Sequence, residues 1–215
     1  DTPVDAYRVA IGGKYAYVAD GWDGLRVINV ANPDLPVEVA FYDTPDYASS
    51  LAVDGNFAYV ADGNDGLRVI NVSDSAALVE TGFYDTPGYA SSVVIVDNYA
   101  YVADDTSGLR IINVANPNAP VEAGFYNTPG FALGVTVNDV YAYIADGYGG
   151  LRVINVADPT APIETGFFDT PGYASGVAVA GSYAYVADYN GGLRIINVSN
   201  PITPVEVGFD QVKKI

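Results

Sequence analysis

Short runs of β-branched and aromatic residues alternate along the whole chain with Gly, Pro, Asn and Asp. The runs have the length of strands, and no helix-length window keeps its apolar side chains at a helical period without a Gly or Pro. Near the C-terminus the pattern predicts four strands, at about 174–180, 183–188, 193–198 and 205–209. We therefore expect β-structure throughout and no helix.

The same four-strand pattern occurs five times at a constant spacing. Leu193 opens the third predicted strand of the last copy, and its equally spaced counterparts are Leu25, Leu67, Leu109 and Leu151. Counted from the first residue, the repeats span 1–42, 43–84, 85–126, 127–168 and 169–210, and they leave 211–215 as a C-terminal tail. A repeat of this period is typical of solenoids and propellers.

The sequence of the third strand of each repeat distinguishes between these two architectures. Residues 193–198, Leu-Arg-Ile-Ile-Asn-Val, carry apolar side chains on both faces, which fits a sheet covered on each side by another sheet. Four antiparallel strands in a unit of about 40 residues describe a propeller blade. The sequence therefore predicts an all-β, five-bladed β-propeller as a single domain over 1–210, with blades standing in a closed circle. Because the chain begins and ends at repeat boundaries, we expect contiguous blades without strand exchange.

The residue pattern of the repeat resembles that of a known family. The segment 192–201, Gly-Leu-Arg-Ile-Ile-Asn-Val-Ser-Asn-Pro, follows Tyr-Val-Ala-Asp at 185–188 and precedes Pro-Val-Glu-Val-Gly at 204–208. This is similar to the LVIVD repeat of bacterial and archaeal extracellular propellers, and more distantly to YVTN-type surface-layer repeats. The resemblance implies a secreted or cell-surface protein and brings no shared catalytic residues. The second repeat departs at 73–78, where Ser-Asp-Ser-Ala-Ala-Leu replaces two prolines, and we expect a weaker turn there.

Composition removes several classes of function. The chain has 26 acidic and 9 basic residues, a net charge of −17, which repels nucleic acid and anionic lipid. No apolar run approaches the roughly 20 residues of a membrane span. Cys, His and Met are absent, which excludes thiol chemistry, imidazole catalysis and zinc sites built from His or Cys. Cations, basic proteins and neutral sugars remain as ligands.

Two loops of each repeat carry the polar and aromatic residues. The loop between the second and third strands reads Ala-Asp-x-x-x-Gly-Leu. The loop between blades reads Phe-Tyr-Asp-Thr-Pro-x-Tyr-Ala at 41–48 and 83–90, with one or two changes at 125–132 and 167–174. Strand direction alternates within a blade, so both loops emerge at the same end. We therefore expect one acidic and aromatic rim.

Residues that are identical in all five repeats are expected to serve folding, the need that every blade shares. We expect each Asp to accept hydrogen bonds from amides of the turn that follows it, and each Arg to neutralise a nearby acid. These structural rings are Asp20, Asp62, Asp104, Asp146 and Asp188, and Arg26, Arg68, Arg110, Arg152 and Arg194. The Glu of each fourth strand, from Glu38 to Glu206, is expected to guard an exposed sheet edge.

A cation is the alternative reading of the repeated acids. Calcium prefers oxygen ligands, and Asp62–Gly66 resembles part of a calcium loop but lacks the distal Glu of an EF-hand. The sequence predicts no other cofactor, and the metal question stays open.

Positions that vary between repeats are better candidates for ligand binding. The tips after the second strand supply exposed aromatic, amide and carboxylate groups, the combination that a sugar site needs, although drift in unconstrained loops gives the same variation. The candidates are Trp22, Asp23, Asn64, Asp65, Thr106, Tyr148, Tyr189 and Asn190. Arg8 has no counterpart in the other repeats, and it is expected to pair with Asp46 or Asp5 or to contact a ligand directly.

These observations favour a non-catalytic binding or scaffold propeller that presents its rim to a protein or small ligand, outside the cell or on its surface. A lectin-like or calcium-assisted binder is the alternative, and a glycoside hydrolase is a remote one. Almost every acid belongs to a five-fold set and none forms an evident acid/base pair, so we expect no enzyme. We expect a monomer that binds protein or glycan, with no nucleic acid and no membrane insertion.

Overall fold

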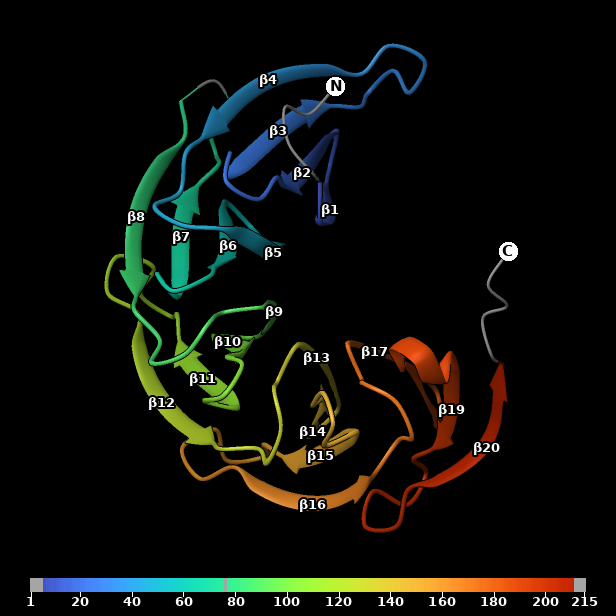
Figure 1. Cartoon of the computed structure of the whole chain (residues 1–215). Helices are drawn as coiled ribbons and strands as arrows, with labels where there is room; N and C mark the ends of the chain where they lie inside the picture. The colour runs from blue at the N-terminus through green and yellow to red at the C-terminus, as the bar shows by residue number, and fades with distance from the viewer. Residues whose placement is uncertain (1–5, 76, 211–215) are drawn as a thin grey trace. The chain divides into compact units, whose positions relative to one another are not determined.

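The computed structural model describes residues 6–75 and 77–210, and their regular structure is β apart from one 3-10 turn, η1 (Tyr189–Gly191) (Figure 1). The strands form five four-stranded antiparallel sheets, and the strands of each sheet follow one another in chain order. Each sheet comes from one contiguous repeat, which confirms blades without strand exchange. No α-helix occurs in the described residues, as expected.

The strand bounds follow the spacing of the sequence repeat. The first sheet consists of β1 (Arg8–Gly12), β2 (Tyr15–Ala19), β3 (Leu25–Asn29) and β4 (Val37–Tyr42). The second consists of β5 (Ala48–Asp54), β6 (Phe57–Asp62), β7 (Leu67–Asn71) and β8 (Val79–Tyr84). The third consists of β9 (Ser92–Val96), β10 (Tyr99–Ala103), β11 (Leu109–Asn113) and β12 (Val121–Tyr126). The fourth consists of β13 (Gly134–Asn138), β14 (Tyr141–Ala145), β15 (Leu151–Asn155) and β16 (Ile163–Phe168). The fifth consists of β17 (Gly176–Ala180), β18 (Tyr183–Ala187), β19 (Leu193–Asn197) and β20 (Val205–Asp210).

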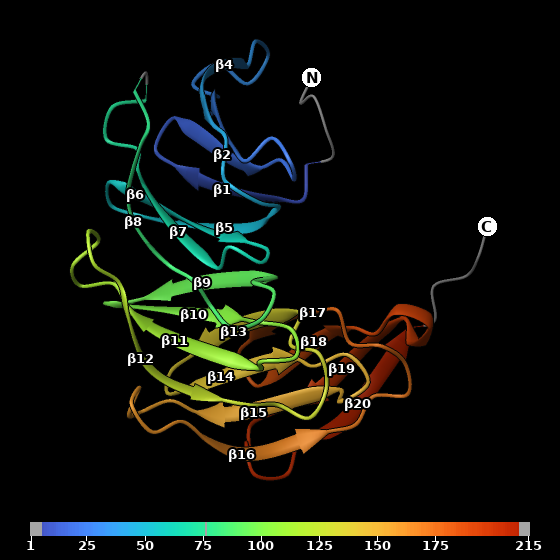
Figure 2. The same cartoon turned by 60° about the vertical axis from the view of Figure 1, so that its left-hand side comes forward.

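The chain divides into two compact units, each with its own core. Unit 1 is Asp1–Val102 with Ile112–Glu122, and unit 2 is Ala103–Ile111 with Ala123–Ile215. Unit 1 contains the first and second sheets, which lie side by side in Figures 1 and 2, and unit 2 contains the fourth and fifth. No helix in the described residues is long and apolar enough to cross a membrane.

The cores of the two units repeat one packing solution. In unit 1 the first sheet presents a face made of Tyr17, Ala19, Leu25 and Val27, which we call the Tyr face. It packs on a face of the second sheet, the Ala face, made of Ala48, Leu51, Ala58, Val60 and Ile70. In unit 2 the Tyr face of the fourth sheet, made of Tyr143, Ala145, Leu151 and Val153, packs in the same way on Ala174, Ala184, Val186 and Ile196. In the second sheet the apolar residues on the two faces of β7 therefore serve two different neighbours, because Ile70 packs with the first sheet and Leu67 and Val69 pack with the third.

Close approach of backbone requires a glycine in the outermost strand. In β16 a Cβ on Gly166 would overlap the carbonyl oxygen of Pro201, which lies in the turn between β19 and β20. Gly208 holds the same position in β20, and there the nearest heavy atom to such a Cβ is Ile195 Cδ1 at 3.8 Å. The glycine of β16 thus serves sheet-to-sheet contact within unit 2.

The departure of the second repeat is matched by a change in the first. The first sheet has Ala40 where the later sheets have glycine, and the second repeat has Leu78 where the others have proline. Both side chains pack against the same core. Ser75 also donates a hydrogen bond to the Tyr15 hydroxyl, 2.9 Å away. The altered turn of the second repeat therefore contacts the first sheet through Leu78 and Ser75. These contacts occur in the one sheet pair where Ala40 replaces the glycine of the later sheets.

Gly166→Ala should lower the free energy of unfolding by about 1–3 kcal/mol, the usual cost of overpacking. Gly208→Ala is the matched control and should change it by less than about 0.5 kcal/mol, because within unit 2 the nearest heavy atom to its Cβ, Ile195 Cδ1, lies at an ordinary contact distance of 3.8 Å. Urea denaturation of both variants measures the difference. Equal destabilisation by the two substitutions would contradict the assignment of this glycine to sheet-to-sheet contact.

Candidate functional site

The loops after the second strands are held in place by the backbone. In unit 2, Asp146–Gly150 form a tight turn in which the Gly149 amide donates to the Asp146 carbonyl at 2.8 Å. Gly147 also exchanges two backbone hydrogen bonds of 3.0 Å with Ala174, in the loop that enters the fifth sheet. Tyr148, at the tip of the turn, is thereby brought against the neighbouring loop.

The repeated Asp connects the end of the second strand to the loop that enters its own sheet. The Asp146 carboxylate accepts hydrogen bonds from the Thr128 hydroxyl and from the Gly130 amide, 2.8 Å away. Asp188 accepts in the same way from Thr170 and Gly172, and Asp62 accepts from the Asp46 amide. The expectation that these carboxylates bond the turn that follows them is therefore wrong: the donors lie in the preceding Thr-Pro loop, which the buried carboxylate pins to the strand.

Each repeated Arg is buried and neutralises acids, as expected. Arg152 Nη2 lies 3.0 Å from Asp169 Oδ1, and Nε lies 3.7 Å from Asp146 Oδ2. All five guanidinium groups also lie over a Phe ring of the fourth strand, at 4.5–5.0 Å from its centroid. Glu38, Glu80, Glu164 and Glu206 lie 3.5–4.0 Å from the Arg of their own sheet. These glutamates are therefore partners of the arginine in addition to charges at a sheet edge.

Burial raises the pKa of Asp146 and of Asp62 above the ordinary value of an aspartate. The hydrogen bonds from Thr128 and Gly130, and the charge of Arg152, oppose the shift at Asp146 without cancelling it. An acid whose pKa is higher in the folded chain than in the unfolded chain binds more protons when folded. The contribution of such a group to stability therefore falls as the pH rises through the interval above the ordinary pKa.

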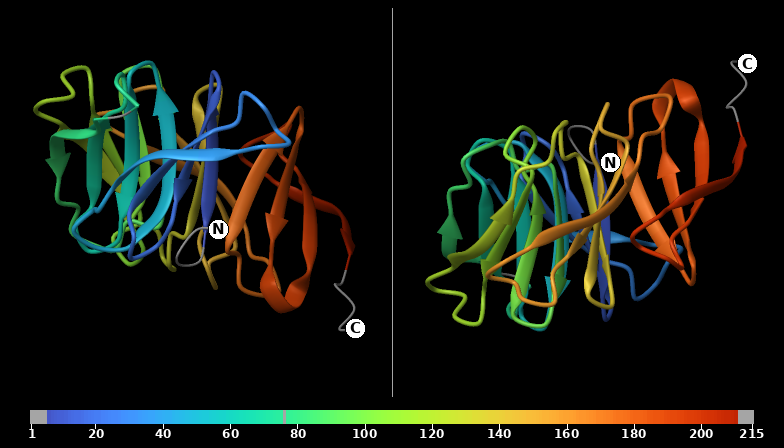
Figure 3. Two further views of the ribbon diagram at one scale, coloured as in Figure 1. Left: turned by 90° about the horizontal axis from the view of Figure 1, so that it is seen from above. Right: turned by 90° about the horizontal axis from the view of Figure 1, so that it is seen from below.

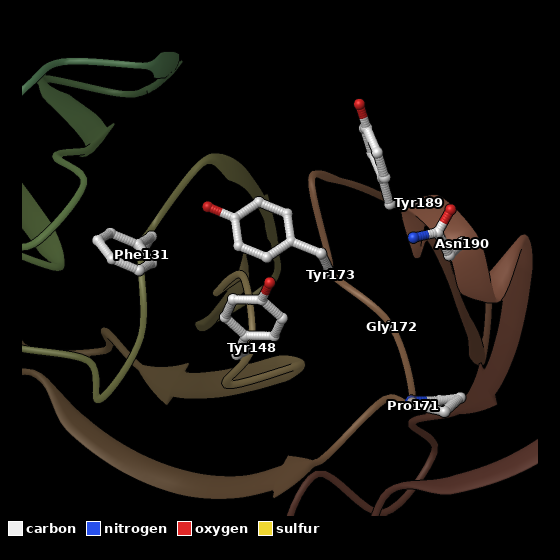
Figure 4. A pocket seen from close by; sticks show the side chains of 7 residues that line it. All are labelled: Phe131, Tyr148, Pro171, Gly172, Tyr173, Tyr189 and Asn190. Carbon is white, nitrogen blue, oxygen red and sulfur yellow. The ribbon is translucent and has the colours of Figure 1, made fainter.

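Four aromatic side chains of unit 2 line an open pocket of about 640 Å³. They are Phe131, Tyr148, Tyr173 and Tyr189, and Pro171, Gly172 and Asn190 complete the wall (Figure 4). The rings of Tyr148 and Tyr173 meet edge to face with centroids 4.8 Å apart, and Tyr173 lies between Phe131 and Tyr189. None of the seven lining residues carries a charge.

Tyr189 holds an unusual backbone conformation. Its φ is +46°, in the left-handed region, where its counterparts in three other repeats are Gly21, Gly63 and Gly147. A bulky residue there is strained by the clash of its Cβ with the backbone. The side chain is nevertheless 73% exposed at the pocket. Asp105, with φ of +50°, is the other non-Gly residue at this repeat position.

Unit 1 has a second aromatic cluster at the corresponding loops. Trp22, 66% exposed, meets Tyr47 edge to face with centroids 5.2 Å apart, and Tyr7 meets the same ring at 5.1 Å. Trp22 and Tyr47 occupy the repeat positions of Tyr148 and Tyr173. An aromatic tip packed on an aromatic loop residue is therefore a feature of both units.

The remaining predicted site residues are mostly engaged elsewhere. Asp23 and Asp65 pair with the Arg three residues on, both at 3.3 Å, and Asn64 donates its backbone and side-chain amides to Asp46 at 2.7 and 2.8 Å. Thr106 and Arg8 are exposed. Asp46, one expected partner of Arg8, is taken by Asn64, and the other, Asp5, lies outside the described residues. Of the nine candidates, the structure brings Tyr148, Tyr189 and Asn190 together in one pocket.

The proposed calcium loop is occupied by protein groups. Asp62 accepts the Asp46 amide, and Asp65 pairs with Arg68. The described part of the chain contains no group of three or more acidic, His or Cys side chains that could hold a metal ion.

Sequence reasoning missed Phe131 and Tyr173 as pocket residues. Both belong to the loop between blades, whose aromatic position recurs in successive repeats and therefore suggests a structural role. A usable signal lay in comparing this loop position with the variable tip of the preceding repeat. Both positions are aromatic in only two cases, Trp22 with Tyr47 and Tyr148 with Tyr173.

Raising the pH from about 4 should lower the free energy of unfolding, at most by about 1.4 kcal/mol per pH unit for one bound proton. Denaturation in 1 M NaCl, where the Debye length is about 3 Å, removes surface repulsion and isolates the buried groups. Asp146→Asn and Asp62→Asn should each flatten this dependence, and the exposed Asp34→Asn controls for loss of one charge. An unchanged slope in both buried variants would contradict the role of burial.

Comparison with solved structures supports the fold. The chain resembles the periplasmic gluconolactonase of Pseudomonas aeruginosa at a TM-score of 0.85 and 13% identity, covering 98% of this chain and 72% of that one. It resembles a functionally unknown protein from Desulfotomaculum acetoxidans at 0.80 and 15%, covering 96% and 70%. It resembles the computationally designed protein Ika8 at 0.73 and 7%, covering 96% and 63%. The chain thus spans only part of the length of each of these structures, and at such identities the likeness concerns the fold alone.

The sequence itself matches no protein of curated function. The family model of the LVIVD repeat matches five consecutive segments, 4–44, 45–86, 87–128, 129–170 and 171–209. These segments contain every described strand except the last residue of β20. The chain therefore belongs to the LVIVD-repeat family of β-propellers.

Proposed function

We propose that this chain is a non-catalytic binding module whose unit 2 pocket takes a neutral carbohydrate. The observation that carries the proposal is the gathering of Phe131, Tyr148, Tyr173 and Tyr189 around one pocket beside the amide of Asn190. A volume of about 640 Å³ lies within the range of small-ligand sites, roughly 300–1,000 Å³.

The chemistry of the lining favours a sugar. Aromatic rings offer flat apolar surfaces whose faces carry partial negative charge and attract C–H groups. The Tyr hydroxyls and the Asn190 amide offer hydrogen-bond donors and acceptors at the margin of the pocket. A pyranose has the complementary form, an apolar face bounded by hydroxyl groups. The uncharged lining and the net charge of −17 both disfavour an anionic sugar.

The disposition of the acids supports binding without catalysis. Glycoside hydrolysis needs two carboxyl groups about 5–10 Å apart across the scissile bond. The pocket has no carboxylate in its wall, and the nearby Asp146, Asp169 and Asp188 are tied to arginines. The likeness to a gluconolactonase rests on fold alone and does not supply the missing groups.

We place this binding outside the cell or on its surface, as the resemblance to extracellular LVIVD propellers implies. Neutral glycans are abundant ligands there, and a rigid β-scaffold without cysteine folds equally well in an oxidising compartment. Detection of the native protein in the extracellular or surface fraction tests this placement.

An array of neutral glycans should identify the ligand. Wild-type protein should bind with and without calcium, and Tyr148→Ala should weaken binding at least tenfold, the equivalent of about 1.4 kcal/mol. Trp22→Ala is the matched control, because it removes an exposed aromatic at the same repeat position in unit 1. An empty array for the wild type refutes the sugar proposal, and loss of binding in Trp22→Ala alone moves the site to unit 1.

Tyr189→Gly should separate stability from binding. Relief of the left-handed strain should raise the free energy of unfolding by about 1 kcal/mol, and removal of the ring should weaken glycan binding. Asp105→Gly relieves the same conformation in another repeat, so it should also stabilise the chain. It is a control for stability alone, because Asp105 interacts electrostatically with Tyr173 and pairs with Ala132 beside Phe131. Thermal unfolding and glycan titration of both variants provide the test. A Tyr189→Gly protein that binds as tightly as the wild type would remove Tyr189 from the site.

A further inference from the structure

Two residues of unit 2 occupy a left-handed backbone position that glycine holds in the other three repeats. They are Tyr189, with φ of +46°, and Asp105, with φ of +50°. Tyr189 lines the aromatic pocket from η1, the orange-red coil at one end of the fifth sheet in Figure 3. A residue held in a sparsely populated conformation points to a local requirement for its side chain, and such positions gather at binding sites. The pocket provides that requirement for Tyr189.

Asp105 is fixed to the loop that carries Phe131, one of the rings of the pocket. The Asp105 amide donates a hydrogen bond to the Ala132 carbonyl, and the Ala132 amide donates one to the Asp105 carbonyl, both 3.0 Å long. At the same position of the fourth repeat, a Cβ on Gly147 would lie 3.0 Å from the ring of Tyr173, and the other two glycines show the same approach. Phe131 holds the ring position that faces Asp105. The side chain of Asp105 therefore starts beside the Phe131 ring.

The charge of Asp105 also reaches Tyr173, the central ring of the pocket. Burial raises the pKa of Tyr173, and the nearby charge of Asp105 raises it further. The Tyr173 hydroxyl points towards the side of the pocket where Phe131 lies, and the amide of Asn190 lies on the opposite side (Figure 4). The aromatic surface therefore has a carboxylate at the end beside Phe131 and an amide at the other end.

The carboxylate of Asp105 is unpaired, unlike the repeated acids. It has no hydrogen-bond donor and no arginine partner among residues 6–75 and 77–210, and its Oδ1 is buried. Asp146 and Asp188, by contrast, each accept two hydrogen bonds and face an arginine. A buried carboxylate oxygen without a donor is costly, and a donor from outside the chain relieves that cost. Asp105 thus has accepting capacity that the fold does not use.

We propose that Asp105 is a ligand-binding residue of the unit 2 pocket and selects neutral sugars that present two adjacent free hydroxyl groups beside Phe131. Asp105 then adds specificity to the sugar site proposed above, and its role rests on that proposed function. The two oxygens of a carboxylate accept one hydrogen bond from each of two adjacent hydroxyls, and such charge-assisted bonds are stronger than those between neutral groups. The left-handed backbone at Asp105 thereby serves a contact that glycine cannot make.

Glycan titration of Asp105→Asn and Asp105→Gly tests this role. Both substitutions remove the charge at a backbone position that Asn and Gly tolerate, so the variants should fold, and Asp105→Gly should melt at a higher temperature than the wild type. On an array of neutral gluco-, manno- and galacto-oligosaccharides, each variant should bind roughly tenfold or more weakly than the wild type. Weaker binding by a more stable protein separates the role of the carboxylate from damage to the fold.

The charge and the hydroxyl groups each have a control. Asp34→Asn, exposed in unit 1, loses the same charge and should bind as the wild type does. Each oligosaccharide that binds is compared with a partner in which two adjacent terminal hydroxyls are O-methylated. The wild type should prefer the unmethylated form, and this preference should shrink in Asp105→Asn and persist in Asp34→Asn.

The outcomes separate this role from the sugar site itself. Binding by Asp105→Asn within about twofold of the wild type would overturn the role of Asp105 and leave the sugar site standing. Equal weakening in Asp34→Asn would overturn it as well, because the effect would then follow net charge. A wild type that binds none of the oligosaccharides refutes both the sugar site and the specificity assigned to Asp105.

Discussion

Packing of one sheet face on the next is the interaction on which this chain depends. A four-stranded sheet with apolar residues on both faces cannot bury them alone, and no α-helix in the described residues covers either side. The Tyr face and the Ala face solve this together, because Leu and Tyr from one sheet fill the shallow surface left by Ala and Val on the other. The glycine of the outer strand β16 serves the closeness of that contact.

The buried charges fix the loops that carry the pocket. A carboxylate without exposure is costly unless it is paired and hydrogen-bonded. Asp188 meets that requirement by accepting from Thr170 and Gly172 and by facing Arg194 at 3.4 Å. The loop that carries Tyr173 is thereby tied to the strand that ends beneath Tyr189. Rigid loops lower the entropy lost on binding, so in the proposed site these charges would favour binding without touching the ligand.

The sequence predicts the fold almost completely because the repeat multiplies each weak signal by five. The expected strand 193–198 is observed as Leu193–Asn197, and the contiguous sheets follow from the phase of the repeat. The partners of Asp146 were predicted wrongly, since a sequence states that a residue recurs but not which loop reaches it. Phe131 and Tyr173 were missed for a related reason: pocket residues come from two successive repeats, which backbone contacts such as the bridge between Gly147 and Ala174 bring together.

Tyr189 shows how one repeat differs from the others without losing its fold. Glycine is the residue that the left-handed position favours, and the chain keeps it in three of five repeats. A change to Tyr adds strain at one turn, but the hydrogen bond from the Gly192 amide to the Tyr189 carbonyl, 3.1 Å, preserves the local path of the backbone. The strain at Tyr189 does not disturb the surrounding sheets, because their packing does not involve the tip of this turn. Variation therefore collects where the common core does not need the residue, which is also where a ligand can reach it.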